Sequence, residues 1–176
     1  MVSKSFRVGV FAGLLTAVIA GAPAVASAAP TVTLSSDQSL VKNGTTVNFT
    51  LTITASSGAD HGSINHLVDS LDGPIDGKAG SSCTTAPTTP DFNFAVRTFT
   101  CTYPFVVDGR GGTTQTHTLS ADGTETFCNP PPLTPGGPCP GAVTDVGWAS
   151  TSNPVTVTLK CKKGQKLRKG KCRRRK

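Results

Sequence analysis

Several motifs that mark enzymes and metal proteins are missing from this chain of 176 residues. It has no Gly-x-Ser-x-Gly nucleophile motif, no Cys-x-x-Cys pair and no stretch with the spacing of an EF-hand calcium loop. The sequence therefore carries none of these motifs for catalysis or metal binding, and it indicates no cofactor. We expect a protein that is not an enzyme.

The chain also lacks an apolar run long enough to cross a bilayer comfortably. The run from Val8 to Ala20 follows Lys4 and Arg7, and small residues ending at Ala28 come after it. A basic start, a short apolar run and a small-residue end are typical of a secretory signal, so cleavage is predicted after Ala28. No cysteine near that point offers a site for lipid attachment. The predicted location is secreted, extracellular or associated with the cell surface.

Acidic residues are absent from the last 17 positions, and basic residues are scarce before them. Residues 29–159, here called the body, hold four Lys or Arg and all ten Asp and Glu, a formal charge of −6. Residues 160–176, the basic tail, hold 11 Lys or Arg and no aromatic residue. Without aromatic side chains the tail cannot stack on bases, so sequence-specific nucleic-acid recognition is not expected.

The body has the composition of strands and turns, with much Thr, Val and Phe interrupted by Gly, Pro, Asn and Asp. The clearest strand is 46–55, where apolar and polar residues alternate strictly. Turn pairs such as Asn43-Gly44 and Asp122-Gly123 separate the strands. The other expected strands are 31–35, 97–107, 113–121, 143–150 and 154–160.

About seven short strands at this spacing predict an all-β fold, an antiparallel immunoglobulin-like β-sandwich over residues 29–159. Residues 81–90 and 129–140 are expected to be loops. Between Ser63 and Leu71, apolar residues fall at helical spacing, and the choice between helix and strand stays open. The predicted core includes Val47, Phe49, Leu51, Ile53, Phe99, Tyr103, Val155, Val157 and Leu159.

A resemblance to a known family rests on the runs VKNGTTVNFTLTIT, LVDSLDG, FTCTYPFVV, GTTQTHTLSADG and NPVTVTL. Together they resemble the immunoglobulin-like repeat domains of bacterial exported and surface proteins. That resemblance implies a structural spacer or an adhesive unit, and it implies no site residues. The chain departs from the family in having one copy and an insertion between Cys128 and Cys139. The ending CKKGQKLRKGKC is similar to short Cys-Lys-Gly tails of exported actinobacterial proteins.

The six cysteines form an even set in a chain expected to be exported, which favours three disulfides over a metal site. Neighbouring cysteines bracket turn-rich segments, so we predict one of the 15 connectivities on that ground. Each bond should contribute roughly 2–3 kcal/mol to stability. The predicted pairs are Cys83 with Cys101, Cys128 with Cys139, and Cys161 with Cys172.

The loop CNPPPLTPGGPC is stiff because it carries five prolines between its cysteines. A stiff loop loses little conformational entropy on binding, so it suits a recognition loop that presents Leu133 to a protein partner such as a protease. The alternative interpretation is an inert insertion that resists proteolysis.

The basic tail crowds like charges that repel one another by about 1 kcal/mol per close pair. A dense cationic tail favours an anion-binding role through counterion release, and the alternative is a solvated tag for solubility. Its expected partner is an anionic cell-wall or envelope polymer, an acidic membrane surface or extracellular nucleic acid. The predicted anion-binding residues are Lys160, Lys162, Lys163, Lys166, Arg168, Lys169, Lys171, Arg173, Arg174, Arg175 and Lys176.

Three further sets of residues each have two interpretations. Asp69, Asp72 and Asp76 indicate turns or a weak calcium site. Trp148 indicates core packing or a sugar-stacking platform. The three histidines are lone residues or partners of Ser63, Ser70 or Asp60 in a hydrolytic arrangement; they are His61, His66 and His117.

The function predicted from these patterns is that of a non-enzymatic, secreted structural or adhesive module whose tail binds an anionic envelope surface. The alternative is a ligand-binding or protease-inhibitor-like module that acts through the loop between Cys128 and Cys139.

Overall fold

A computed structural model describes residues 29–85, 92–93, 98–134, 137–168 and 171–174. All regular structure within these ranges is β, in thirteen strands. Seven strands have five or more residues, and the other six are pieces of two to four residues, which is why the expected number of about seven was too low. The strands are β1 (Thr31–Ser36), β2 (Leu40–Val41), β3 (Thr45–Thr54), β4 (His61–Asp69), β5 (Gly73–Pro74), β6 (Phe92–Asn93), β7 (Thr98–Val107), β8 (Thr114–His117), β9 (Leu119–Asn129), β10 (Ala142–Thr151), β11 (Val155–Leu159), β12 (Gln165–Arg168) and β13 (Lys171–Arg174).

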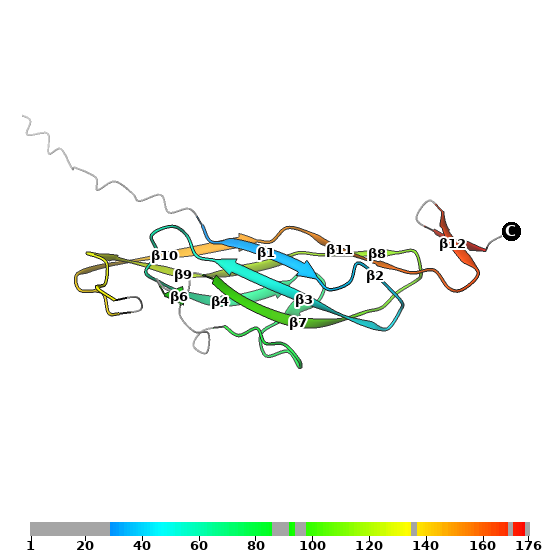
Figure 1. Cartoon of the computed structure of the whole chain (residues 1–176), viewed down its shortest axis with the longest axis horizontal. Helices are drawn as coiled ribbons and strands as arrows, with labels where there is room; N and C mark the ends of the chain where they lie inside the picture. Colours follow the sequence, from blue (N-terminus) through cyan, green and yellow to red (C-terminus); the bar gives the residue numbers. More distant parts are fainter. Residues whose placement is uncertain (1–28, 86–91, 94–97, 135–136, 169–170, 175–176) are drawn as a thin grey trace, which may run out of the picture.

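The strands form a sandwich-like body that is elongated along one axis (Figure 1). One sheet has the order β1-β3-β7, and a larger one has the order β10-β9-β4-β5 with β6 also paired to β4. A third sheet, β2-β11-β8, leads to the separate hairpin β12-β13. All pairs are antiparallel except β2 with β11, which is parallel.

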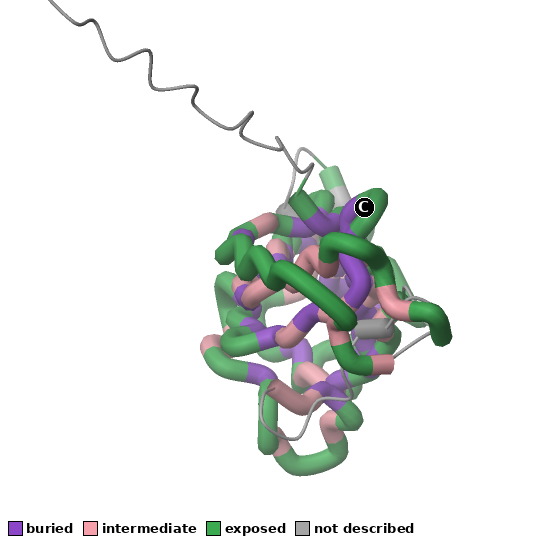
Figure 2. The backbone as a smooth tube through the Cα atoms, turned by 90° about the vertical axis from the view of Figure 1, so that its left-hand side faces the viewer, coloured by how far each residue is buried: buried purple, intermediate pink, exposed green. Residues whose placement is uncertain are grey.

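The core lies where alternating apolar side chains of the sheets meet, and Figure 2 shows buried and exposed residues alternating along the chain. In β3 the predicted alternation is confirmed, because all four of its apolar residues from Val47 to Ile53 are fully buried. Seven of the nine predicted core residues are buried, while Phe99 and Val155 are partly buried against that core. Other strands, such as β1 and β4, contribute further buried residues to this core.

The segment left open between helix and strand is strand β4. Its inward residues are Gly62 and Ile64, and then Leu67 and Asp69, with Asn65 and His66 both exposed between them. A β-bulge between Ile64 and His66 causes this change of phase. The bulge places two buried residues three positions apart, which is the spacing that resembled a helix.

The prediction of one continuous strand over residues 113–121 is wrong at its C-terminal end. The chain leaves the β2-β11-β8 sheet after His117 and begins β9 in the larger sheet at Leu119. The predicted turn at Asp122-Gly123 is also wrong, since both residues lie inside β9. Glycine at position 123 lets the backbone of β9 pack closely against β4 and Trp148. A Cβ atom at this position would lie 1.9 Å from the Ser63 carbonyl oxygen and 2.9 Å from the Trp148 ring.

Candidate anion-binding site

The basic tail folds as the antiparallel hairpin β12-β13, closed by the predicted disulfide between Cys161 and Cys172. Gln165, the first residue of β12, donates its backbone N–H to the Lys162 carbonyl at 3.0 Å and closes the turn before the strand. Gly164 in this turn has a φ of +83°, a conformation that strains other residues. The covalent link and the turn together hold the cationic side chains on one compact element.

Seven tail cations are exposed, and within the described residues none of them forms an ion pair with a carboxylate. They are Lys160, Lys162, Lys163, Lys166, Arg168, Arg173 and Arg174. Lys171 belongs to β13, whereas the predicted anion-binding residues Lys169, Arg175 and Lys176 lie outside the described residues. The charge on this hairpin is therefore available to a ligand.

The hairpin packs directly on the body at Gly111. A Cβ atom at this position would lie 2.8 Å from the Lys160 carbonyl oxygen, 3.1 Å from Cys161 Cα and 3.2 Å from Cys172 Sγ. Lys160 also donates its backbone N–H to the Val41 carbonyl at 2.7 Å. Only glycine allows the tail disulfide to lie this close to the turn after β7, so the tail is docked on the body.

A groove of about 1080 Å³ lies at this junction of body and tail, and we name it the junction groove. The lining includes two cations of the body, Lys42 and Arg110, which no pattern in the sequence indicated as binding residues. They reach the site because β3 and β7 pair from Thr45 opposite Val107, which brings the turns beside them together. The residue types of both turns are typical of turns in the sequence, but the sequence does not reveal that β3 and β7 pair beside them. The groove is lined by Lys42, Asn43, Gly109, Arg110, Gly111, Thr113, Lys160, Cys161, Lys162, Lys163, Gln165 and Cys172.

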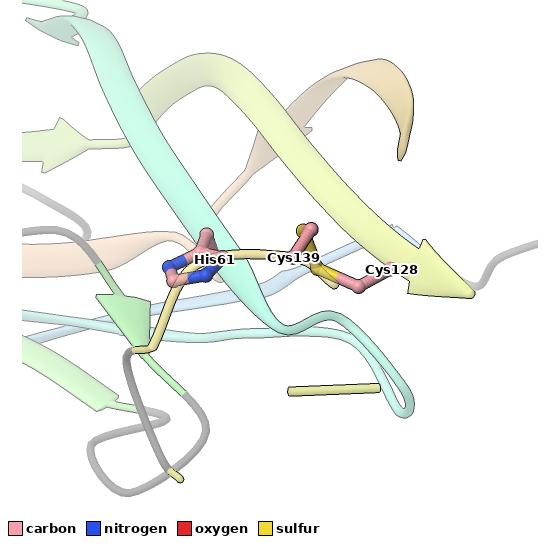
Figure 3. A group of neighbouring side chains, drawn as sticks. All are labelled: His61, Cys128 and Cys139. Atoms are coloured by element: carbon pink, nitrogen blue, oxygen red, sulfur yellow. A yellow bond between two sulfur atoms is a disulfide. The ribbon is translucent and has the colours of Figure 1, made fainter. Parts of the chain in front are cut away.

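The predicted disulfide between Cys128 and Cys139 is present, and it lies beside His61 (Figure 3). One His61 nitrogen and the two sulfur atoms lie within 4.8 Å of one another, the single such group of three potential metal ligands in the described ranges. The sulfur atoms are bonded to each other, and His61 Nε2 is 3.1 Å from the Gly137 carbonyl oxygen. The disulfide and the His61 contact together hold the loop against β4, which is a structural role.

Leu133 on that loop is 99% exposed. The loop, drawn in yellow, lies at the opposite end of the long axis from the tail (Figure 1). The loop also contains residues 135–136, which lie outside the described ranges. Exposure of Leu133 is compatible with both interpretations of the loop, so its recognition role stays a prediction.

The three aspartates of the DSLDGPIDG segment, residues 69–77, do not gather around one point. Asp69 is buried, and its carboxylate accepts hydrogen bonds from Tyr103 Oη at 2.7 Å and from the backbone N–H groups of Leu71 and Asp72 at 2.8 and 3.0 Å. Asp72 pairs with Lys78, and Asp76 accepts a hydrogen bond from Thr85. Each carboxylate thus has a structural partner in the turns, as the turn interpretation predicts.

Two of the three histidines pair with aspartates in separate places. His117 is fully buried with Nδ1 3.1 Å from both oxygens of Asp69, and His66 is exposed with Nδ1 2.9 Å from Asp122. The hydrogen bond and the charge of Asp122 raise the pKa of His66. The described hydrogen bonds of these histidines include none to Ser63, Ser70 or Asp60, so the hydrolytic arrangement is not assembled.

Trp148 is buried, as the core-packing interpretation predicts. Its ring packs above Gly123, and its Nε1 has no hydrogen-bond partner. The sugar-stacking platform is therefore not formed, since the ring is not presented to solvent.

These observations define an all-β, sandwich-like protein with three disulfides and a cationic groove at one end. Three disulfides indicate folding in an oxidising environment. Within the described ranges, no helix has the length and hydropathy needed to span a bilayer. Comparison with known proteins gave no match among protein-family models, curated proteins or solved structures.

Proposed function

We propose that this protein is an exported, non-enzymatic module that its cationic hairpin holds on an anionic polymer or surface of the cell envelope. The observation that carries the proposal is the set of seven exposed tail cations without carboxylate partners on a disulfide-closed hairpin.

The physical basis is the release of counterions when the hairpin meets a polyanion. Each cation that neutralises an anionic group frees condensed ions, so affinity falls steeply as salt concentration rises. The body has the opposite formal charge and is repelled from the same surface. This difference orients the protein with its tail toward the anionic surface and with the opposite end, where the loop 128–139 lies, away from it.

The test is retention of the full chain on purified cell walls at increasing salt concentration. A neutralised-tail variant is compared with the wild type, and its six replaced cations lie on or next to the hairpin. We expect the wild type to be retained at low salt and released by a salt wash, and the variant to lose at least tenfold in retention. The substitutions are Lys162→Gln, Lys163→Gln, Lys166→Gln, Arg168→Gln, Arg173→Gln and Arg174→Gln.

A charge-preserving control exchanges Lys and Arg at the same six positions and should be retained like the wild type. Equal retention of the wild type and the neutralised-tail variant would refute the proposed function. Loss of retention in the charge-preserving control would show that side-chain shape, and not charge, holds the protein.

A further inference from the structure

The junction groove gathers charge from parts of the chain that are far apart in sequence. Of the four Lys and Arg residues in the body, two line this groove, Lys42 and Arg110. The tail adds Lys160, Lys162 and Lys163, and no Asp or Glu lines it. Five cations therefore face one groove of about 1080 Å³ in a body whose formal charge is negative.

The backbone around these cations is fixed by hydrogen bonds. Gly109 donates its N–H to Asn43 Oδ1 at 2.7 Å, which joins the two body turns that carry Lys42 and Arg110. The Arg110 carbonyl accepts the Thr113 N–H at 3.1 Å and the Thr113 hydroxyl at 2.7 Å. With the tail docked at Gly111, the cations are held near one another before any ligand arrives. A preorganised site of this kind loses less entropy on binding than a free cationic peptide does.

We propose that the junction groove is a binding site for a linear polymer of phosphodiester groups, of the polyol-phosphate or sugar-phosphate kind. This inference rests on the proposed function and names the site and the ligand class for it. The tail alone would attract any polyanion. In the junction groove, two body residues, Lys42 and Arg110, would bind the polymer together with the tail.

The chemistry of the lining supports this ligand class. No aromatic side chain lines the groove, so it offers no stacking surface for bases or for sugar rings. It offers ammonium groups, one guanidinium, and the polar side chains of Asn43, Thr113 and Gln165. A guanidinium and several ammonium groups match phosphate oxygens, which accept several charge-assisted hydrogen bonds at once. An extended groove with five cations also exceeds the needs of a single phosphate ion.

The test compares two double variants of the full chain that lose the same charge. Lys42→Gln with Arg110→Gln removes the body side of the groove, and Lys166→Gln with Arg168→Gln removes two hairpin cations that do not line it. All four side chains are exposed, so neither variant should unfold the protein. Dissociation constants are measured at one fixed salt concentration with a synthetic poly(glycerol phosphate) oligomer.

We expect the groove variant to bind the oligomer at least tenfold more weakly and the hairpin variant to change by no more than about threefold. Equal losses in the two variants would overturn the groove site and leave the proposed function standing, because a diffuse cationic tail would explain both. Unchanged binding by the neutralised-tail variant would instead refute the proposed function itself.

Two further polymers of matched charge test the ligand class with the wild type. Oligogalacturonate carries carboxylates in place of phosphates, and oligo(dT) carries phosphodiesters together with bases. We expect poly(glycerol phosphate) to bind at least fivefold more tightly than oligogalacturonate and no more weakly than oligo(dT). Tighter binding of oligogalacturonate would overturn the choice of phosphate, and tighter binding of oligo(dT) would assign the groove to a nucleic acid.

Discussion

At the scale of single residues, Asp69 is the polar centre of the core. Its carboxylate joins His117 and Tyr103, and the His117 ring packs between Phe49 and Phe105 with ring centres 4.4 and 4.5 Å apart. Burial raises the pKa of Asp69, but hydrogen bonds from His117, the Leu71 N–H and Tyr103 together outweigh it, so the pKa lies below its ordinary value. Burial beside the same carboxylate also raises the pKa of the Tyr103 hydroxyl, which stays protonated and donates.

This network predicts a pH-dependent stability. The pKa of Asp69 is lower in the folded protein than in the unfolded chain, so the ionised carboxylate stabilises the fold. This stabilisation is fully present above the unfolded-state pKa of about 4 and is lost as the pH falls through the folded-state pKa. Asp69→Asn should lower the free energy of unfolding at pH 7 by about 1–3 kcal/mol, since it leaves buried donors poorly satisfied. Urea unfolding of both proteins at pH 7 and below pH 4 should show this difference shrinking in acid. A difference that stays constant with pH would contradict the role of the Asp69 charge.

Asp108→Asn provides the matched control, because Asp108 is exposed in the turn after β7. It should change the free energy of unfolding by less than about 0.5 kcal/mol at either pH.

At the scale of elements, Gly123 sets how closely β9 approaches β4 and Trp148. Gly123→Ala would force a Cβ atom into the Ser63 backbone and the Trp148 ring, and should destabilise the protein by about 1–3 kcal/mol or more. Gly147→Ala in neighbouring β10 is the control, because the nearest atom to its Cβ would be 4.0 Å away. Thermal unfolding of both variants measures the effect. Equal melting temperatures for the two would show that the close approach at Gly123 is not needed.

The elements also show which features the sequence could predict. Strands such as β3 were predictable, because one buried face imposes a period of two on the side chains. The bulge in β4 and the position of Gly123 inside β9 depend on the neighbouring strand, which a single chain segment does not reveal. The all-β fold class and the three disulfides therefore followed from local pattern, and the change of sheet between His117 and Leu119 did not.

The candidate anion-binding site also contains residues that the sequence could predict and residues that it could not. The tail cations were evident because eleven Lys and Arg residues are crowded into 17 positions. Lys42 and Arg110 are ordinary turn residues in the sequence, and only the pairing of β3 with β7 brings them to the tail. Pairing between distant strands is set by the whole core, so these two residues could not have been assigned from local pattern.

At the scale of the whole molecule, the three disulfides differ in their surroundings. The Cys83–Cys101 disulfide belongs to the core, whereas the other two close the loop 128–139 and the tail hairpin, which lie at opposite ends of the long axis (Figure 1). Cys83 and Cys101 are 1% and 2% exposed, whereas the other four cysteines are partly exposed. Thiol–disulfide exchange requires access to a sulfur atom, so we expect mild reductant to open the two end disulfides before the core one. Timed alkylation and peptide mass mapping under native conditions measure the order. Early labelling of Cys83 or Cys101 would contradict it.

If the tail tethers the protein as proposed, the position of β11 between two strands has a mechanical consequence. Strand β11 lies between β2 and β8 and continues directly into Lys160 and the disulfide-closed hairpin. A pull directed along β11 would load the hydrogen bonds on both of its edges in shear and at the same moment. Bonds loaded together resist far more force than bonds opened one after another, and drag from flowing liquid would therefore reach the acidic body without peeling its last strand away.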